Sequence, residues 1–118
     1  MLPSTPTEAQ EGHTLVAYLR LRGIPFTHTP NETGSSPEAR RRAVRMKQQG
    51  VSRGFPDYII VTNTGIIFIE LKRATKSLSR VSPEQKQWIE TLSAAGSPAY
   101  IAYGAEEAIA FIEQHQRK

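Results

Sequence analysis

Two carboxylates and one ammonium group stand on neighbouring apolar segments of this sequence. Asp57 opens the segment 57–62, and Glu70 and Lys72 close the segment 66–72. Both segments are rich in Ile and Val, so they are predicted to be β-strands. Carboxylate oxygens are preferred ligands of Mg²⁺ and Mn²⁺, and such a cation can activate water and stabilise charge on a phosphate. The three residue types therefore suit metal-assisted hydrolysis, provided that the strands bring them together.

The segment Asn63-Thr64-Gly65 predicts that the two strands form a hairpin. A turn centred on Asn63-Thr64 places Asp57 opposite Glu70, whereas a turn centred on Thr64-Gly65 places Asp57 opposite Lys72, with Glu70 diagonal to it. Opposed Cβ atoms lie about 5 Å apart and diagonal ones roughly 7–8 Å. Either register gathers the three side chains on one face. A three-residue turn with a bulge would disturb this pairing.

Two interpretations of the three charged residues remain open at this point. A surface hairpin can carry a salt-bridged ladder of Asp, Glu and Lys, and that simple pattern is common. In an apolar strand, however, Asp57 and Glu70 repel each other unless a cation or a proton lies between them. Lys72 could then orient the attacking water or neutralise charge on the phosphate. The preceding Gly54-Phe55-Pro56 segment, the hairpin spacing and the basic flanks favour the catalytic interpretation.

The elements that must position these residues follow the order α-β-α-β-β-α-β-α. We expect an α/β domain, with a mixed β-sheet flanked by helices. Capping boxes and proline and glycine signals predict helices over 7–22, 36–49, 82–96 and 105–115. Apolar segments predict strands over 24–29, 57–62, 66–72 and 98–103. The segment 74–81 is predicted to be a mobile basic loop. In the third helix, Trp88, Ile89 and Leu92 form the predicted buried stripe.

Length and composition limit the class of protein. The chain has 118 residues, which fits one domain spanning 1–118. Cysteine is absent from the sequence, so disulfides, thiolate metal sites and a cysteine nucleophile are excluded. The first residues carry neither a basic start nor an apolar run, so we expect no signal peptide and a cytoplasmic protein. The longest apolar stretches, 58–61 and 65–69, are too short to span a bilayer.

Charge is distributed unevenly along the chain. Residues 39–86 contain eleven Lys or Arg and three Asp or Glu, whereas the remainder contains four basic and eight acidic residues. A basic middle with acidic flanks is typical of a polyanion-binding surface, although an isolated charge run is more often a solvated helix face. We expect phosphate contacts from eight basic residues, namely Arg40, Arg41, Arg42, Arg45, Arg53, Arg73, Lys76 and Arg80.

Four short motifs, in order and at ordinary spacing, resemble those of the VRR-NUC branch of the PD-(D/E)xK nucleases. Gly54-Phe55-Pro56-Asp57 looks like the G-x-P-D motif, and Ile69-Glu70-Leu71-Lys72 looks like the I-E-L-K motif. Ser82-Pro83-Glu84-Gln85 is similar to the S-x-x-Q segment. His28-Thr29-Pro30-Asn31-Glu32 is similar to the H-x-x-N-E stretch of small phage and bacterial members. The likeness covers residues 8–103.

The resemblance implies a restriction-endonuclease-like core and hydrolysis of phosphodiester bonds that depends on Mg²⁺ or Mn²⁺. It implies that Asp57 and Glu70 are metal ligands, that the carbonyl of Leu71 completes the coordination, and that Lys72 is the catalytic lysine. It further implies that Gln85 points from a helix start toward the metal and the DNA backbone.

A glutamate on the first helix often completes such sites in this family. Glu8 fits that place best, with Glu11 as the fallback. Without the resemblance, both would simply be favourable charges in the first turns of a helix.

The resemblance also implies partners. Free-standing members of this size look like homodimeric cutters of branched DNA such as four-way (Holliday) junctions, and the family's distribution suggests a phage or prophage origin. The first helix and the loop 30–36 are candidate dimer interfaces. A nickase, flap or restriction-type nuclease of the same fold, a non-catalytic DNA-binding module, and an RNA substrate stay open as alternatives. We expect no small-molecule cofactor.

Overall fold

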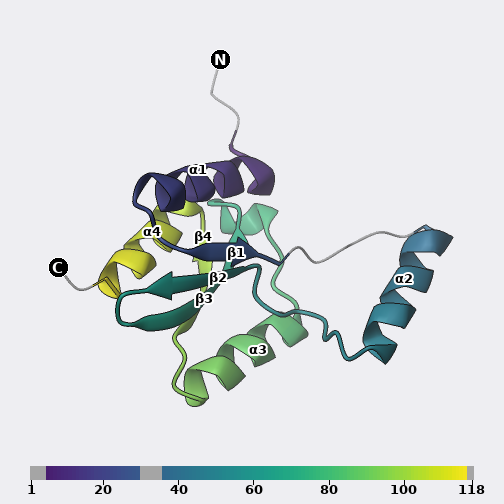
Figure 1. Cartoon of the computed structure of the whole chain (residues 1–118). Helices are drawn as coiled ribbons and strands as arrows, with labels where there is room; N and C mark the ends of the chain where they lie inside the picture. The colour runs from purple at the N-terminus through teal and green to yellow at the C-terminus, as the bar shows by residue number, and fades with distance from the viewer. Residues whose placement is uncertain (1–4, 30–35, 117–118) are drawn as a thin grey trace.

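Four strands form one mixed sheet in the order β1-β2-β3-β4 (Figure 1). The structure is a computed structural model and describes residues 5–29 and 36–116. The pair β1–β2 and the pair β2–β3 are antiparallel, and β3 and β4 are parallel. The strands span Phe26–His28 (β1), Tyr58–Thr62 (β2), Gly65–Lys72 (β3) and Ala99–Tyr103 (β4).

The helices occur in the predicted order and end within a few residues of the predicted bounds. Both predicted capping boxes are present, from Thr7 with Gln10 and from Ser82 with Gln85. The helices span Glu8–Leu21 (α1), Pro37–Gln48 (α2), Pro83–Ala94 (α3) and Ala105–Gln114 (α4). The loop 74–81 contains a short 3₁₀ helix, Lys76–Leu78 (η1), which the sequence did not predict.

The hairpin β2–β3 adopts the first of the two registers allowed by the sequence. Thr62 pairs with Gly65 and Tyr58 pairs with Ile69, so the turn consists of Asn63 and Thr64. The same register, extended by one residue, places Asp57 opposite Glu70. The alternative of a three-residue turn with a bulge does not occur, because the pairing between the described strands β2 and β3 is continuous.

The core lies between the sheet and the helices α1 and α4, which cover the same face (Figure 1). Ile60, Ile69 and Leu71 of the sheet are fully buried, as are Leu15 of α1 and Ile112 of α4. Burial of each such side chain stabilises the fold by about 1.5–3 kcal/mol. Because side chains alternate along a strand, Glu70 and Lys72 project to the opposite face from Ile69 and Leu71.

Helix α3 lies on that opposite face, against β4 (Figure 1). Its predicted buried stripe is only partly buried, because Trp88, Ile89 and Leu92 keep intermediate exposure and no residue of α3 is fully buried. The predicted stripe is therefore less buried than the sequence indicated. The helix covers the β4 side of the sheet and leaves Val61 and Ile66 on β2 and β3 exposed.

Helix α2 stands apart from the sheet and the other helices (Figure 1). None of its residues is buried, and Val44 is 57% exposed. Ala39 and Met46 are its only residues of intermediate exposure. Among the described residues, no helix is long and apolar enough to cross a membrane.

Candidate active site

The hairpin brings Asp57, Glu70 and Lys72 together at one end of the sheet. The Leu71 amide donates a hydrogen bond of 3.3 Å to Asp57 Oδ2, which ties the loop carboxyl to the facing strand. Lys72 Nζ lies 3.6 Å from Glu70 Oε2. Glu70 is only 3% exposed and Lys72 only 8% exposed, so neither is a solvated surface charge. A salt-bridged surface ladder therefore does not describe this hairpin.

Burial raises the pKa of Glu70 from its ordinary value to about 9, and the neighbouring charge of Asp57 adds to the shift. Burial also raises the pKa of Asp57. Lys72 opposes both shifts but does not outweigh the loss of water around the carboxyls. Without a cation, the raised pKa of Glu70 favours its protonated form, which relieves the repulsion between the two carboxyls.

The loop that presents Asp57 is held from two sides. On one side, the Thr29 amide donates to the Asp57 carbonyl at 2.6 Å and the Thr29 hydroxyl donates to the Pro56 carbonyl at 2.8 Å. On the other side, Gly54 packs against the start of α3, where an added Cβ would lie 2.7 Å from the Gln85 nitrogen. Gly54 also has φ +83°, a conformation that favours glycine.

Three aromatic rings add to this support, and the sequence did not reveal the cluster. Phe55 packs edge-on against Phe68 of β3 and against Trp88 of α3, with ring centroids 5.7 and 5.0 Å apart. The Trp88 indole donates to the Arg53 carbonyl at 3.1 Å. Trp88 therefore links α3 to the loop just before Asp57. The aromatic residue two positions before Asp57 is the signal that could have pointed to this contact.

Gln85 connects the start of α3 to the carboxylate pair. Its Oε1 accepts from the Ser82 amide at 2.9 Å, as the capping box predicts, while its Nε2 donates to Glu70 Oε2 at 3.2 Å. One amide group thus caps a helix and orients Glu70. The resemblance implied an approach of Gln85 to the metal and DNA, and the geometry places it directly beside Glu70.

The two glutamates of α1 have different surroundings. Glu11 is buried and accepts a hydrogen bond of 3.1 Å from the Ala105 amide at the start of α4. Since the N-cap residue Gly104 has no side chain to cap α4, the Glu11 carboxylate takes that role. Glu8 instead lies near the site: partial burial and the charge of Asp57 raise its pKa, while Lys72 and His28 oppose the shift.

His28 and Tyr58 flank the site on the side of α1, and the sequence did not single out Tyr58. Their rings stack with centroids 4.5 Å apart. The Tyr58 hydroxyl would lie 2.9 Å from a Cβ added at Gly12, so glycine on α1 makes room for it. Burial and the charges of Asp57 and Glu8 raise the pKa of Tyr58. Asn31 and Glu32 of the H-x-x-N-E stretch lie outside the described residues.

The donor set of the site fits a hard divalent cation, although it is small. Glu70 Oε1 is buried and accepts no hydrogen bond, so it has an unused lone pair beside Asp57. Within 5–29 and 36–116, no three of His, Cys, Asp and Glu gather closely enough to form a cation site on their own. The two carboxyls would therefore leave most positions around a cation to water and substrate, an arrangement typical of Mg²⁺.

The eight basic residues predicted to contact phosphate fall into two groups. Two of them contact other parts of the chain. Arg73 donates to the Thr5 and Pro6 carbonyls, and Lys76 Nζ lies 4.8 Å from the centre of the Tyr103 ring. The other six are exposed, in α2, the following loop and the end of the η1 loop, and comprise Arg40, Arg41, Arg42, which also has an interaction within the chain, Arg45, Arg53 and Arg80.

The loop 74–81 is more ordered than the predicted mobile basic loop. Besides containing η1, it is tied to the end of β3, because the Ser79 hydroxyl accepts from the Arg73 amide at 2.9 Å. The contact of Lys76 with Tyr103 attaches it to β4. These contacts fix the segment that directly follows Lys72.

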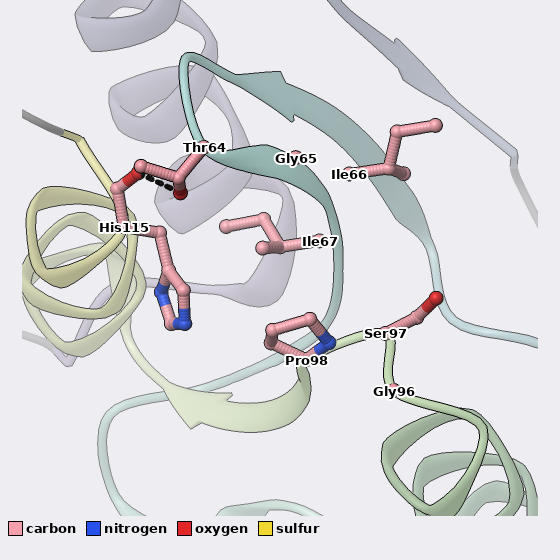
Figure 2. Close-up of a pocket in the computed structure, with 8 residues that line it drawn as sticks. All are labelled: Thr64, Gly65, Ile66, Ile67, Gly96, Ser97, Pro98 and His115. Atoms are coloured by element: carbon pink, nitrogen blue, oxygen red, sulfur yellow. Dashed lines mark hydrogen bonds between the residues drawn. The ribbon is translucent and has the colours of Figure 1, made fainter.

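Two shallow hollows lie away from the carboxylate pair. One, of about 490 Å³, opens at the hairpin turn and is lined by Ile66, Pro98 and His115 (Figure 2). Thr64 donates a hydrogen bond to the His115 carbonyl there (Figure 2). This hollow lies at the opposite end of β3 from Glu70. The second, of about 680 Å³, runs between the end of α2 and α3 and is lined by Lys47, Arg53 and Trp88.

Comparison with known proteins agrees with the fold and with the family that the motifs resemble. The sequence model of the VRR-NUC domain matches residues 14–106, which is most of the chain. A solved structure described as a VRR_NUC domain protein superposes with a TM-score of 0.75 at 24% identity, covering 95% of this chain and 89% of that one. No curated protein matches. The chain belongs to the VRR-NUC family, and its domain is a nuclease domain of the PD-(D/E)xK type.

Proposed function

We propose that this protein is a metal-dependent endonuclease that hydrolyses phosphodiester bonds in branched DNA, such as four-way junctions, as a homodimer. One observation carries the catalytic part of the proposal. The buried Glu70 carboxyl lies beside the half-buried Asp57 carboxyl, one Glu70 oxygen has no hydrogen-bond partner, and a lysine lies on the same face. Burying acids in this way is unfavourable unless a cation is to be held, which is why such pairs are typical of functional sites.

Asp57 and Glu70 would hold Mg²⁺ or Mn²⁺, with the Leu71 carbonyl as a further ligand. When bound, the cation supplies charge stabilisation on the phosphate and lowers the pKa of a coordinated water. Glu8 would add a third carboxylate through water at the edge of the site. Gln85 fixes the orientation of Glu70 through the bond from its Nε2.

Lys72 is the group proposed to act on the reacting atoms. Its ammonium group is nearly buried and lies 3.6 Å from Glu70 Oε2, so its position is defined. It would donate to the attacking water or to a phosphate oxygen and so offset the charge that develops there. A cation held by Glu70 would offset the negative charge of that carboxylate and so leave the Lys72 ammonium for the substrate.

The basic surface supports a nucleic-acid substrate. Arg40, Arg41 and Arg45 are exposed on a helix without buried residues, so their charge is accessible to a partner. Arg53 lies three residues before Pro56, which places it next to the active loop, and Arg80 and Lys76 follow the catalytic strand. Contacts from such residues supply affinity without reading sequence.

Branched DNA and a homodimer complete the proposal. They rest on the resemblance to small free-standing family members and on the absence of a base-reading helix among the described elements. Two-fold symmetry would set two sites against two strands of a junction. A nickase or flap nuclease would use the same site, and only substrates can separate these activities.

The proposal is tested by incubating labelled four-way junction, flap, nicked, duplex and single-stranded DNA, and an RNA duplex, with Mg²⁺, Mn²⁺ or EDTA. We expect paired cuts in the junction that require metal and are absent for Asp57→Ala. Metal-dependent cutting of another substrate would support the nuclease activity but would show that the four-way junction is not the preferred substrate. Binding without cleavage under every metal would leave a DNA-binding module.

A further inference from the structure

Arg73 joins two distant parts of the chain immediately beside the site. It directly follows Lys72, the last residue of β3. Its guanidinium donates two hydrogen bonds of 3.1 Å, from Nε to the Pro6 carbonyl and from a terminal nitrogen to the Thr5 carbonyl. The two carbonyls lie 67 and 68 positions earlier in the sequence. They immediately precede Thr7, the N-cap of α1.

This clamp determines where α1 begins. The N-cap Thr7 is followed by Glu8 as the first residue of the helix, so only Thr7 separates the clamped Pro6 from Glu8. The other fixed point of α1 is Glu11, whose carboxylate binds the start of α4. Arg73 and Glu11 thus hold the first turn from two sides, and the exposed Glu8 between them lies close enough to Asp57 and Lys72 for their charges to act on its carboxyl.

The chemistry of the clamp requires arginine. A planar guanidinium presents donors at fixed spacing and can bind two successive carbonyls, whereas a lysine ammonium would act as a single, rotatable point charge. The backbone of Arg73 is itself held, since its amide donates to the Ser79 hydroxyl at 2.9 Å. The base of the side chain is therefore as well fixed as its tip.

We propose that Arg73 is a positioning residue that keeps Glu8 beside Asp57 and Glu70 by clamping the chain just before α1. This replaces the phosphate contact that its charge alone suggested. The inference rests on the proposed function, because it assigns Glu8 a part in metal binding. It predicts that the effect of changing Arg73 passes through Glu8.

A double-mutant cycle between Arg73→Lys and Glu8→Gln tests this dependence. In the otherwise native protein, Arg73→Lys is expected to raise the Mn²⁺ dissociation constant, measured by calorimetry without DNA, and to lower kcat about tenfold, since small misplacements of a catalytic constellation have effects of this order or larger. KM for DNA should change little. In the Glu8→Gln background, the same substitution should alter either quantity by less than about twofold.

Hydrogen exchange supplies a readout that does not depend on metal or activity. Arg73→Lys should speed exchange of the amides in the first turn of α1, near 8–11, and leave the hairpin amides unchanged. Arg20→Lys, the same substitution in the last turn of α1, is the matched control and should leave exchange, Mn²⁺ affinity and kcat as in the native protein.

Three results would overturn the inference. Equal effects of Arg73→Lys with and without Glu8→Gln would show that Arg73 acts independently of Glu8. A raised KM with a weaker salt dependence would return it to the role of a phosphate contact. Full Mn²⁺ affinity and full activity of the Glu8→Gln variant would show that Glu8 has no part in metal binding, so Arg73 could not act through it. Failure of the proposed function itself differs from all three results, because the native protein would then neither bind Mn²⁺ nor cleave DNA.

Discussion

The hairpin β2–β3 and the helix α2 both carry charged side chains, but those of the hairpin are mostly buried and those of α2 are exposed. In the hairpin, Glu70 and Lys72 are nearly buried, and Asp57 is tied to the Leu71 amide. In α2, no residue is buried and five Lys or Arg lie within 12 residues. The hairpin packs against α1 and β1 and is linked to α3 through Gln85, whereas α2 makes little contact with the other described elements.

The contrast separates two requirements of a nuclease. Hydrolysis needs a few groups at fixed positions, and burial, which raises the pKa of both carboxyls, is tolerated in exchange for that geometry. Affinity for a polyanion needs only accessible positive charge, and exposed arginines provide it without a fixed partner. We therefore expect changes in the hairpin to act on the chemical step and changes in α2 to act on binding.

The largest effect is expected from Glu70→Gln. It removes the ligand charge but keeps the shape and the acceptor for Gln85, so cleavage should fall by roughly 10³-fold or more, which corresponds to several kcal/mol of transition-state stabilisation. The melting temperature in EDTA should not fall, because the buried carboxyl already favours its neutral form. Glu90→Gln on the exposed face of α3 is the control. A strongly lowered melting temperature would argue that Glu70 is structural.

A smaller loss is expected from displacing the loop that presents Asp57. In Gly54→Ala the new methyl group would meet the backbone of Glu84 and Gln85 at 2.7 Å, and φ is +83°. We expect a loss of about 1–3 kcal/mol of stability and up to about 10²-fold in kcat. Gly50→Ala is the matched control, because φ is +94° but nothing lies within 4 Å. Similar losses in both variants would show that only backbone strain matters.

The raised pKa of Glu70 predicts a pH dependence of stability. The folded carboxyl keeps its proton up to about pH 9, whereas in the unfolded chain it loses it near the ordinary value of 4.5. Stability in EDTA should therefore decrease as the pH rises between these values, and Glu70→Gln should flatten the curve.

Mn²⁺ should counter this decrease, because it displaces the proton and binds more tightly at higher pH, by up to about tenfold per unit for one proton. Thermal unfolding from pH 6 to 9, with EDTA or Mn²⁺, measures both trends. A Mn²⁺-induced shift in melting temperature that does not grow with pH would contradict the assignment of Glu70 as a ligand.

The smallest effect on catalysis is expected from α2. Replacing Arg40, Arg41 and Arg45 by Gln should weaken DNA binding and reduce the slope of log affinity against log salt by about 2 to 3, since each phosphate contact contributes about 0.9. The rate with saturating DNA should change far less than KM. Replacing Arg20 and Arg22 by Gln, at the far end of α1, is the control. An unchanged salt slope would exclude α2 from the DNA interface.

Local patterns in the sequence were sufficient for the fold and for the meeting of Asp57 with Glu70 and Lys72. Strand alternation and a hairpin turn determine that contact. The sequence left two registers, and the structure shows why the Asn63-Thr64 turn occurs: the Asn63 amide donates to the Gln116 side chain at 2.7 Å, and Thr64 binds the His115 carbonyl. These partners lie about 50 positions away, beyond the reach of local patterns.

Glu11 and Arg73 contact residues that are even more distant in the sequence. Their partners lie 94 and up to 68 positions away, at the start of α4 and before α1. From the sequence, Glu11 was an alternative to Glu8, and Arg73 was one more basic residue. Local patterns also do not determine the exposure of α2, because a few apolar residues on a helix do not reveal whether another element covers them.

Single-turnover cleavage of labelled DNA by excess enzyme tests the central claim most directly, because it separates chemistry from binding. The native protein and Asp57→Asn are compared with Mg²⁺ and with EDTA, and DNA affinity is measured in parallel. We predict that the native protein cleaves only with Mg²⁺ and that Asp57→Asn binds DNA normally but does not cleave. Cleavage in EDTA, or cleavage by Asp57→Asn at the native rate, would contradict a metal-dependent centre at the hairpin.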